Sequence, residues 1–568
     1  MTGSLLHNRI FRIVTAVLCV AAGCIFMFAL ENYGGISRDE FYQTICVRRY
    51  NESPLGLLVY WIGNLWSSIF GLTLKNLRIL ASLSEILAIA ICSIYLFYST
   101  RRLLLTSIVF LMSCIIIRAG GFTIYNWDTG AYFFDALALC CLLSTISKGS
   151  SIKYIMTGAS IALVTLCRTP SGILLPLALV LIYFSCDNCK SKITALRPLA
   201  IILISFLVTI LAFSLIILKN PLAYFSLFTD NNIITGHSPI KDHARLLTRL
   251  EIITRATPLR WFAGIGSLGL ALLMTRLKKK KWLAVTITTL WIAYCAFMAY
   301  WLTPTNEHIE LMLGMDTPVG LGLLLSLPVY CLFDNNCRPG FKLKLKLLGC
   351  FFMMCSVAFG SDGYYERLTC SFMLPVIIAL LWTIKKKAFR TFVKCSIILL
   401  TASFFVLQTT HLIRFYSIYK DYPEVPYRFY EFRGLKISPA DEDFVHDSFA
   451  GIRMLRSEGV PYVFLGENML TELVCGPDEG LSFQQFHYII GAYEHWSLFK
   501  DSIVDRIDAV VFNPKLKYYG YDQILSDLRQ EGFTDTVSVE DAIIVYRKPR
   551  RNPLKKYPIY QSDGLTVK

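Results

Sequence analysis

Long apolar runs follow one another along this sequence from the N-terminus to about residue 411. Each is nearly free of charge and roughly 14–22 residues long, whereas a helix that crosses a bilayer needs about 20 apolar residues. The chain is 55% hydrophobic and only 17% charged, which is more apolar surface than a soluble globular protein needs. The pattern predicts a polytopic α-helical membrane protein. The runs lie at 13–30, 54–72, 77–98, 103–117, 130–146, 154–167, 171–186, 198–218, 262–275, 282–302, 317–333, 347–359, 369–384 and 392–411.

The basic residues between the runs decide how the chain threads the membrane, because cytoplasmic loops are enriched in Lys and Arg. Arg9 and Arg12 precede the first run and place the N-terminus in the cytoplasm. If 54–72 crosses, the later basic clusters fall outside; if it lies along the outer surface, they all fall inside. We therefore predict about 13 crossings, with 54–72 as a helix in the outer interface. The decisive clusters are Arg101–Arg102, Arg276 with Lys278–Lys281, Lys342/Lys344/Lys346 and Lys385–Lys387.

The enrichment of Lys and Arg in cytoplasmic loops also explains the net charge of +16. In a soluble protein such a charge would suggest nucleic acid, but in a polytopic chain orientation in the membrane is the better explanation, so no nucleic-acid partner is expected. Most of the 18 cysteines lie inside apolar runs and are expected to act as small hydrophobic side chains. The predicted location is the inner (cytoplasmic) membrane.

The first outer loop, 31–76, contains adjacent acidic residues, Asp39 and Glu40, beside the membrane. A carboxylate held over a lipid-borne substrate can act as a general base that deprotonates an attacking hydroxyl or amine. The alternative is that both acids stabilise the first turn of a juxtamembrane helix. The bare pair does not decide between these interpretations.

Asp128 lies at the outer mouth of the fourth span, and Asp135 lies two turns deeper. Carboxylates inside spans are costly and generally face the protein interior for a functional reason. Arg168 lies at a similar depth in a short Arg-Thr-Pro turn, where it can pair with either acid or bind a ligand phosphate through its planar fork. The structural alternatives are an N-cap for Asp128 and an intramembrane ion pair for Asp135.

Glu52, His237 and His243 are candidate ligands for a divalent metal such as zinc, which accepts imidazole and carboxylate groups. The sequence has no HxxxH or HExxH spacing, so exposed loop histidines are the alternative.

Residues 412–568 are soluble in character and, by the parity of the crossings, external. PYVFLG, DAVVFN and DAIIVYRK predict buried strands, and YDQILSDLRQEG predicts an amphipathic helix that ends at Gly532. The chain is therefore divided into a transmembrane module, 1–411, and a C-terminal external α/β domain, 412–568.

The outer loop resembles a known family. Asp39-Glu40-Phe41-Tyr42, then Glu52-Ser53-Pro54-Leu55-Gly56-Leu57-Leu58, then Leu77-Arg78-Ile79-Leu80 are similar to the first periplasmic loop of the GT-C membrane glycosyltransferases. The similarity is greatest to the aminoarabinose lipid A transferases, with the protein O-mannosyltransferases more distant. The second proline of the family's loop and the aromatic pair after the Pro-Leu-Gly are missing here.

The resemblance implies a GT-C fold with outer juxtamembrane helices and assigns roles to residues. Asp39, with Glu40 beside it, matches the acid that orients or deprotonates the acceptor, and Asp128 matches the second acid, with Asp135 as the register alternative. Glu52 matches a metal ligand that pairs with a later histidine, His237 or His243. The cations expected to bind the donor phosphate are Arg168, Lys241, Arg245 and Arg367.

The implied activity is transfer of a hexose or pentose from a polyprenyl-phosphate donor to a lipid, glycan or protein acceptor at the outer face of the membrane, by an inverting displacement. Lipopolysaccharide and other components of the cell envelope are among the acceptors this implies. Alternatives are a transporter or flippase of lipid-linked glycans, and an O-antigen polymerase or ligase. A monomer is expected.

Overall fold

The structure is a computed structural model of the chain. The chain divides into two compact units, Met1–Pro439 and Ala440–Lys568. The structure describes residues 2–29, 31–33, 38–52, 56–118, 124–186, 192–226, 258–277, 280–301, 316–333, 339–358, 371–424, 432–436, 455, 458–465, 496–497, 500–501, 504–512, 521–539 and 542–547.

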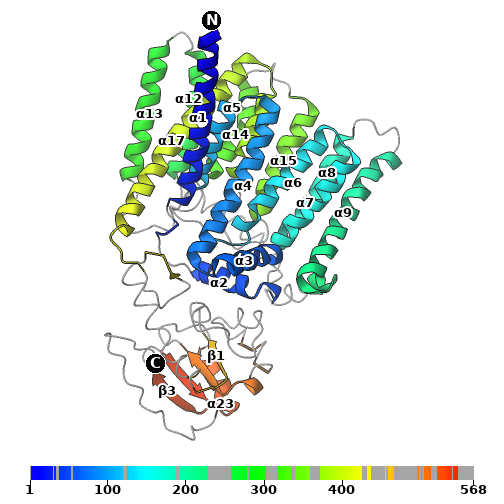
Figure 1. Cartoon of the computed structure of the whole chain (residues 1–568), viewed down its shortest axis with the longest axis vertical. Helices are drawn as coiled ribbons and strands as arrows, with labels where there is room; N and C mark the ends of the chain where they lie inside the picture. The colour runs from blue at the N-terminus through cyan, green and yellow to red at the C-terminus, as the bar shows by residue number, and fades with distance from the viewer. Residues whose placement is uncertain are drawn as a thin grey trace. The chain divides into compact units, whose positions relative to one another are not determined.

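The first unit is a bundle of helices, and every apolar run of the sequence has become one of them (Figure 1). Several helices extend beyond their apolar run into polar residues, as α15 does at its lysine-rich start. The helices are α1 (Thr2–Phe28), α2 (Arg38–Arg48), α3 (Leu57–Phe70), α4 (Leu74–Thr100), α5 (Leu103–Ile117), α6 (Tyr132–Ser147), α7 (Ser151–Cys167), α8 (Leu174–Ser185), α9 (Lys192–Leu218), α12 (Pro258–Arg276), α13 (Lys281–Trp301), α14 (Asp316–Phe333), α15 (Phe341–Ala358), α16 (Leu374–Trp382) and α17 (Lys387–Tyr419).

Five helices in the described part of the chain are long and apolar enough to cross a membrane. The remaining apolar helices are shorter, so length and composition alone do not establish the predicted number of crossings. The long apolar segments are Ile10–Phe28, Leu74–Thr100, Thr129–Ser147, Leu196–Leu218 and Lys387–Thr410. The chain is a membrane protein.

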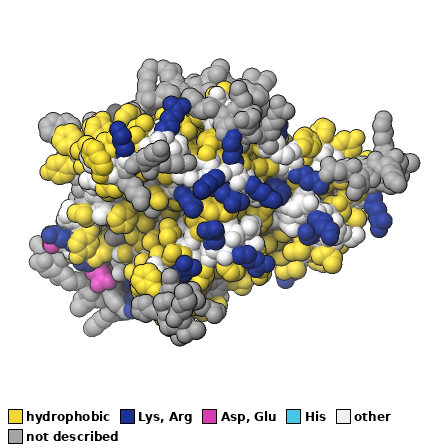
Figure 2. Space-filling model, turned by 90° about the horizontal axis from the view of Figure 1, so that it is seen from above, with side chains coloured by type: hydrophobic (Ala, Val, Ile, Leu, Met, Phe, Trp, Pro, Cys, Tyr) yellow, Lys and Arg dark blue, Asp and Glu magenta, His cyan; other side chains and the backbone are white. Residues whose placement is uncertain are grey.

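Helix α3, which covers the run at 54–72, does not run alongside the long helices. Figure 1 shows α2 and α3 together at the end of the bundle away from the N-terminus, with α3 lying across it. We call this the loop end. The opposite end, which holds the N-terminus and the junctions at Arg101, Lys148, Lys280 and Lys344, is the basic end. Figure 2 looks down on the basic end and shows Lys and Arg side chains across it with few Asp or Glu. The clusters used to predict the threading therefore lie together at one end.

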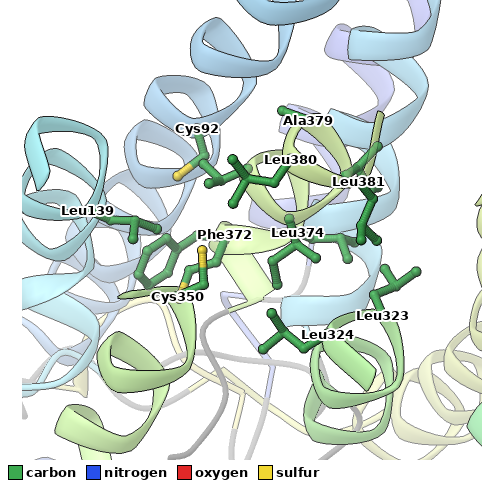
Figure 3. Close-up of a cluster of buried hydrophobic side chains, with 14 of the residues drawn as sticks. Cys92, Leu139, Leu323, Leu324, Cys350, Phe372, Leu374, Ala379, Leu380 and Leu381 are labelled. Carbon is green, nitrogen blue, oxygen red and sulfur yellow. The ribbon is translucent and has the colours of Figure 1, made fainter. Parts of the chain in front are cut away.

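The apolar core of the bundle surrounds α16. This helix has nine residues, all buried, and follows the short helix η7 (Ser371–Met373). Figure 3 shows Leu374 and Leu380 of α16 in one cluster of buried side chains with Phe372, Cys92 from α4, Leu139 from α6 and Cys350 from α15. Cys92 and Cys350 are fully buried in this cluster, in agreement with their expected behaviour as small apolar side chains. Among the described residues, no two cysteines are joined by a disulfide.

The second unit contains a four-stranded mixed sheet in the order β1-β2-β4-β3. β1 (Tyr462–Leu465) is parallel to β2 (Ala509–Phe512), while β4 (Ala542–Tyr546) is antiparallel to both β2 and β3 (Asp535–Val539). Helix α23 (Tyr521–Gln530) precedes β3, and Gly532 ends it with a left-handed φ of +88°. The strands β1, β2 and β4 and the helix confirm the sequence prediction, whereas β3 was not predicted.

The boundary between the units differs from the expected one at residue 412. Helix α17 continues to Tyr419, and the chain beyond it belongs to the first unit as far as Pro439. Phe432 and Leu435 are fully buried there. The side of the membrane that holds the second unit stays a prediction.

Candidate active site

Helix α2 carries the acidic pair at its first turn. Asp39 lies on this helix, but its side chain lies outside the described part of the chain, so its role stays a prediction. Glu40 is buried, and its carboxylate receives two hydrogen bonds from Arg78 of α4: Nε to Oε1 at 2.6 Å and Nη2 to Oε2 at 2.8 Å. Arg78 is itself fully buried. This bidentate pair fixes α2 against α4 and so sets the position of the backbone at Asp39.

A second buried ion pair joins Asp128 to Arg168, with Nε 2.8 Å from Oδ1. Asp128 occupies the N-cap position of the short helix η3 (Thr129–Ala131), but its side chain makes no cap hydrogen bond. The N-cap interpretation is thus not what the structure shows for this carboxylate. Asp135, buried on α6, interacts electrostatically with Arg168 and with Asp128. One arginine therefore interacts with both of the acids that the sequence left as register alternatives.

Arg168 is held in place from several directions. It ends α7, and its Nη1 donates to the carbonyl of Ser356 on α15 at 2.8 Å and to Ser171 Oγ at 3.3 Å. The guanidinium is buried, so most of its N–H groups donate to protein groups. Arg168 therefore links the end of α7 to α15 through Ser356 and to α6 through Asp135, beside Asp128.

Local turn chemistry places Asp128. The side-chain oxygen of Asn126 accepts from the backbone N–H groups of Asp128 (2.9 Å) and Thr129 (2.8 Å), which closes an Asx turn. Tyr125 donates its hydroxyl to the carbonyl of Val59 at 2.7 Å and ties this turn to α3. Burial raises the pKa of Tyr125 well above its usual range, so the phenol stays protonated and keeps this bond.

Helix α3 packs against α2 through buried polar and small residues. Tyr60 donates its hydroxyl to Gln43 at 2.7 Å. Gly63 faces Val47 and Tyr125 so closely that an added Cβ would lie 2.7 Å from a Val47 methyl. The helix that lies across the loop end is therefore fixed to α2 and to the Asp128 turn.

A third buried ion pair was not predicted from the sequence. Arg118, at the end of α5, contacts the Glu31 carboxylate at 2.5 Å and also donates to Ser82 and to the carbonyl of Met27. Ser82 donates to Glu31 as well. A signal was present in the sequence. Arg78 lies within the apolar run 77–98 and Arg118 directly follows the run 103–117, and charges at such positions seldom lack a partner.

Tyr224 adds a buried phenol near Arg168. Its hydroxyl pairs with Thr169 Oγ1 at 2.9 Å and donates to the carbonyl of Thr165 at 3.2 Å. Burial raises the pKa of Tyr224 to about 12. The group is neutral at physiological pH and braces the turn after α7.

The other predicted site residues are not brought together by the described structure. Glu52 ends the short helix η1 (Tyr50–Glu52), with its side chain outside the described part. In the residues for which the structure gives side chains, no three His, Cys, Asp or Glu are grouped so as to hold a metal ion. The remaining predicted phosphate and metal ligands lie wholly outside the described residues: His237, Lys241, His243, Arg245 and Arg367.

No protein-family model matches the chain, and no curated protein sequence does. Two solved structures align with it over 94% of its length: ArnT from Cupriavidus metallidurans bound to undecaprenyl phosphate (11% identity, 98% of that chain covered) and the same protein in the apo state (13% identity, 97% covered). Both have a TM-score of 0.40. ArnT is an aminoarabinose lipid A transferase of the GT-C type, the group that the outer-loop motifs resemble.

Proposed function

We propose that this chain is a membrane glycosyltransferase that moves a sugar from a polyprenyl-phosphate donor to an acceptor hydroxyl or amine at the outer face of the membrane. The observation that carries the proposal is the buried pair of Glu40 and Arg78. It fixes α2, and with it the backbone of Asp39, at the end of the bundle where Asp128 and Arg168 also meet. The Asp39-Glu40 motif and the Arg78 motif, which the sequence resemblance links, are thus in direct contact.

In the proposed reaction Asp39 takes the proton from the acceptor nucleophile, whose oxygen or nitrogen attacks the anomeric carbon. The new glycosidic bond forms as the bond between the anomeric carbon and the phosphate oxygen breaks. The bonding electrons leave with the polyprenyl phosphate, and a single displacement inverts the anomeric centre. Glu40 acts in this scheme as a positioning residue, because its carboxylate is occupied by Arg78.

Negative charge that develops on the leaving phosphate requires nearby cations. Arg168 is bound to Asp128, Ser171 and Ser356, so we assign it the task of holding Asp128 and the surrounding helices. Lys241, Arg245 and Arg367 then become the proposed phosphate ligands. Glu52 with His237 or His243 would hold a divalent metal, which would supply further positive charge for the phosphate.

A transporter of lipid-linked glycans is the competing function, since buried ionisable residues inside helices, such as Asp135 on α6 and Glu85 on α4, also occur along transport pathways. A transporter moves its substrate intact, whereas a transferase releases free polyprenyl phosphate.

The test is complementation of cells that lack the gene with the wild-type chain, Asp39→Asn or the control Asp421→Asn, whose side chain is 80% exposed. Envelope glycans and free polyprenyl phosphate are measured by mass spectrometry at equal levels of membrane-inserted protein. Asp39→Asn is expected to abolish transfer, and Asp421→Asn to preserve it. Near-normal transfer by Asp39→Asn would refute the base assignment. Export of the intact lipid-linked glycan by the wild-type chain, with no transfer product and no free polyprenyl phosphate, would favour the transporter.

A further inference from the structure

The chain that follows α17 returns to the loop that carries Asp39. Lys436 forms a parallel bridge with Tyr33 and an antiparallel bridge with Glu424, and its backbone N–H donates to the carbonyl of Asn32 at 2.9 Å. The main chain at Lys436 therefore lies between the first outer loop and the segment that leaves α17. Parts of the chain some 400 residues apart in sequence are joined here by backbone hydrogen bonding.

Side chains strengthen this contact. The ring of Phe432 lies 5.7 Å from the ring of Phe41, edge to face, and both residues are buried. The ammonium group of Lys436 lies 5.6 Å from the centre of the Tyr33 ring and donates to the carbonyl of Lys420 at 3.0 Å. Aromatic pairs and cation–π contacts of this kind add to the free energy of apolar burial.

A tight turn gives the segment its shape. Leu435 N–H bonds back to the carbonyl of Phe432, and Gly434 has a left-handed φ of +80°. A Cβ at Gly434 would also lie 3.1 Å from Cδ of Lys75, at the start of α4. The left-handed backbone conformation favours glycine at this position, and a Cβ there would also require the Lys75 side chain to shift by a few tenths of an ångström.

These contacts fall on both sides of Asp39. Asn32 and Tyr33 precede it, and Phe41 follows it by two residues. The same stretch is fixed to α4 by Glu31 through Ser82 and by Glu40 through Arg78, and these two α4 residues lie one helical turn apart. Phe432–Lys436, which we call the brace, makes further contacts with this stretch at Asn32, Tyr33 and Phe41.

We propose that the brace is a positioning element for Asp39, built from the far end of the first unit. The inference rests on the proposed function, in which Asp39 is the base. It adds that the rate of transfer depends on Phe432, Gly434 and Lys436, none of which belongs to the resemblance motifs of the outer loop. Because only three residues separate Lys436 from Ala440, where the second unit begins, the brace is also the covalent attachment point of that unit.

The experiment uses the full chain purified in detergent and compares Phe432→Ala, Gly434→Ala and the conservative variant Phe432→Leu with a control, Phe405→Ala, whose ring is on α17 and 46% exposed. Hydrogen exchange of the peptide spanning residues 31–48 reports on the brace directly. Transfer kinetics report on its effect on the proposed base.

We expect exchange in 31–48 to rise by about tenfold in Phe432→Ala and Gly434→Ala, because the loop loses a packed neighbour and opens locally more often. The value of kcat should fall by about 10- to 100-fold with little change in KM for the donor, since misplacing a reacting group by about 1 Å costs up to that much. Phe432→Leu should restore most of the exchange protection of residues 31–48 and most of kcat. Phe405→Ala should change neither the exchange nor kcat.

Unchanged exchange in 31–48 would overturn the brace itself, whatever the activity. Faster exchange with an unchanged kcat would overturn its role in positioning Asp39. If the wild-type chain shows no transfer at all, the proposed function fails, and the role of the brace in positioning a base fails with it. The exchange data would then still decide whether the brace holds the loop.

Discussion

The two ends of the helix bundle handle their charges in opposite ways. At the basic end, cations such as Arg101 and Lys344 are exposed, and Arg102 and Lys394 lie over the ring of Trp382 at 5.4 and 5.6 Å. At the loop end, Arg78, Arg118 and Arg168 are buried, and each is paired with a carboxylate. Exposed charges at a membrane surface cost little and orient the chain. Buried pairs have a desolvation cost of several kcal/mol per ion, so they need a structural or functional reason.

This difference shows where the molecule is specialised. The charges of the basic end orient the chain through their number and through the side of the membrane on which they lie, so each is replaceable by another cation. The charges of the loop end act through individual geometry, since each arginine joins particular helices around the segment 31–41 and the Asp128 turn. We therefore expect substitutions to be costly at the loop end and mild at the basic end.

The largest effect is expected for Arg78→Met. The change leaves the Glu40 carboxylate buried without its partner, and losing one member of a buried pair costs about 3–5 kcal/mol. Thermal and denaturant unfolding in detergent measure the loss. The double variant Arg78→Met with Glu40→Leu should recover much of it, because no isolated charge remains. A loss below about 1 kcal/mol in the single variant would contradict the comparison.

An intermediate effect is expected for Arg168→Lys. The charge is kept, but an ammonium group on a flexible stem does not reproduce the fork that contacts Asp128, Ser171 and the Ser356 carbonyl. The expected loss of unfolding free energy is about 1–3 kcal/mol, the cost of leaving buried polar groups unsatisfied. The same unfolding measurement applies, with Arg101→Lys at the basic end as the matched control. Equal, small losses in both variants would show that the geometry of Arg168 is unimportant.

The smallest effect is expected for Lys344→Gln at the basic end. Lys344 is exposed, and surface substitutions of this kind change the unfolding free energy by about 0.5 kcal/mol or less. Unfolding and the fraction of protein inserted into membranes are both measured. A loss as large as that of Arg78→Met would mean that the basic end also depends on individual contacts.

The sequence predicted the helices well, because a run of lipid-compatible residues can satisfy its backbone hydrogen bonds only within itself. It predicted the position of α3 across the loop end for a different reason: the basic clusters lie together only if that segment does not cross. Arg78 stood in one of the motifs of the resemblance, but no role was predicted for it and its contact with Glu40 was not predicted. These residues are 38 positions apart, and no local pattern links them.

The strand β3 shows the same limit in the second unit. Its sequence, DTVSV, is partly polar and alternates weakly, so its apolar content alone does not indicate a strand. It becomes a strand because it pairs with β4 along its whole length. The boundary between the units lies beyond residue 412 for a related reason, since Phe432 is buried and packs on Phe41, which is far away in sequence.

By itself, then, the sequence determined that this protein is a bundle of apolar helices with its basic junctions at one end and an acidic loop at the other. Those properties depend on the order of residues along the chain, through hydrophobicity, helix length and charge. Only the tertiary structure decided which charges meet: Glu40 with Arg78, Glu31 with Arg118, and Asp128 with Arg168. It also decided that the backbone N–H of Lys436 bonds the carbonyl of Asn32. Each of these contacts joins residues that are brought together by helix packing, and packing depends on the shape of the whole core.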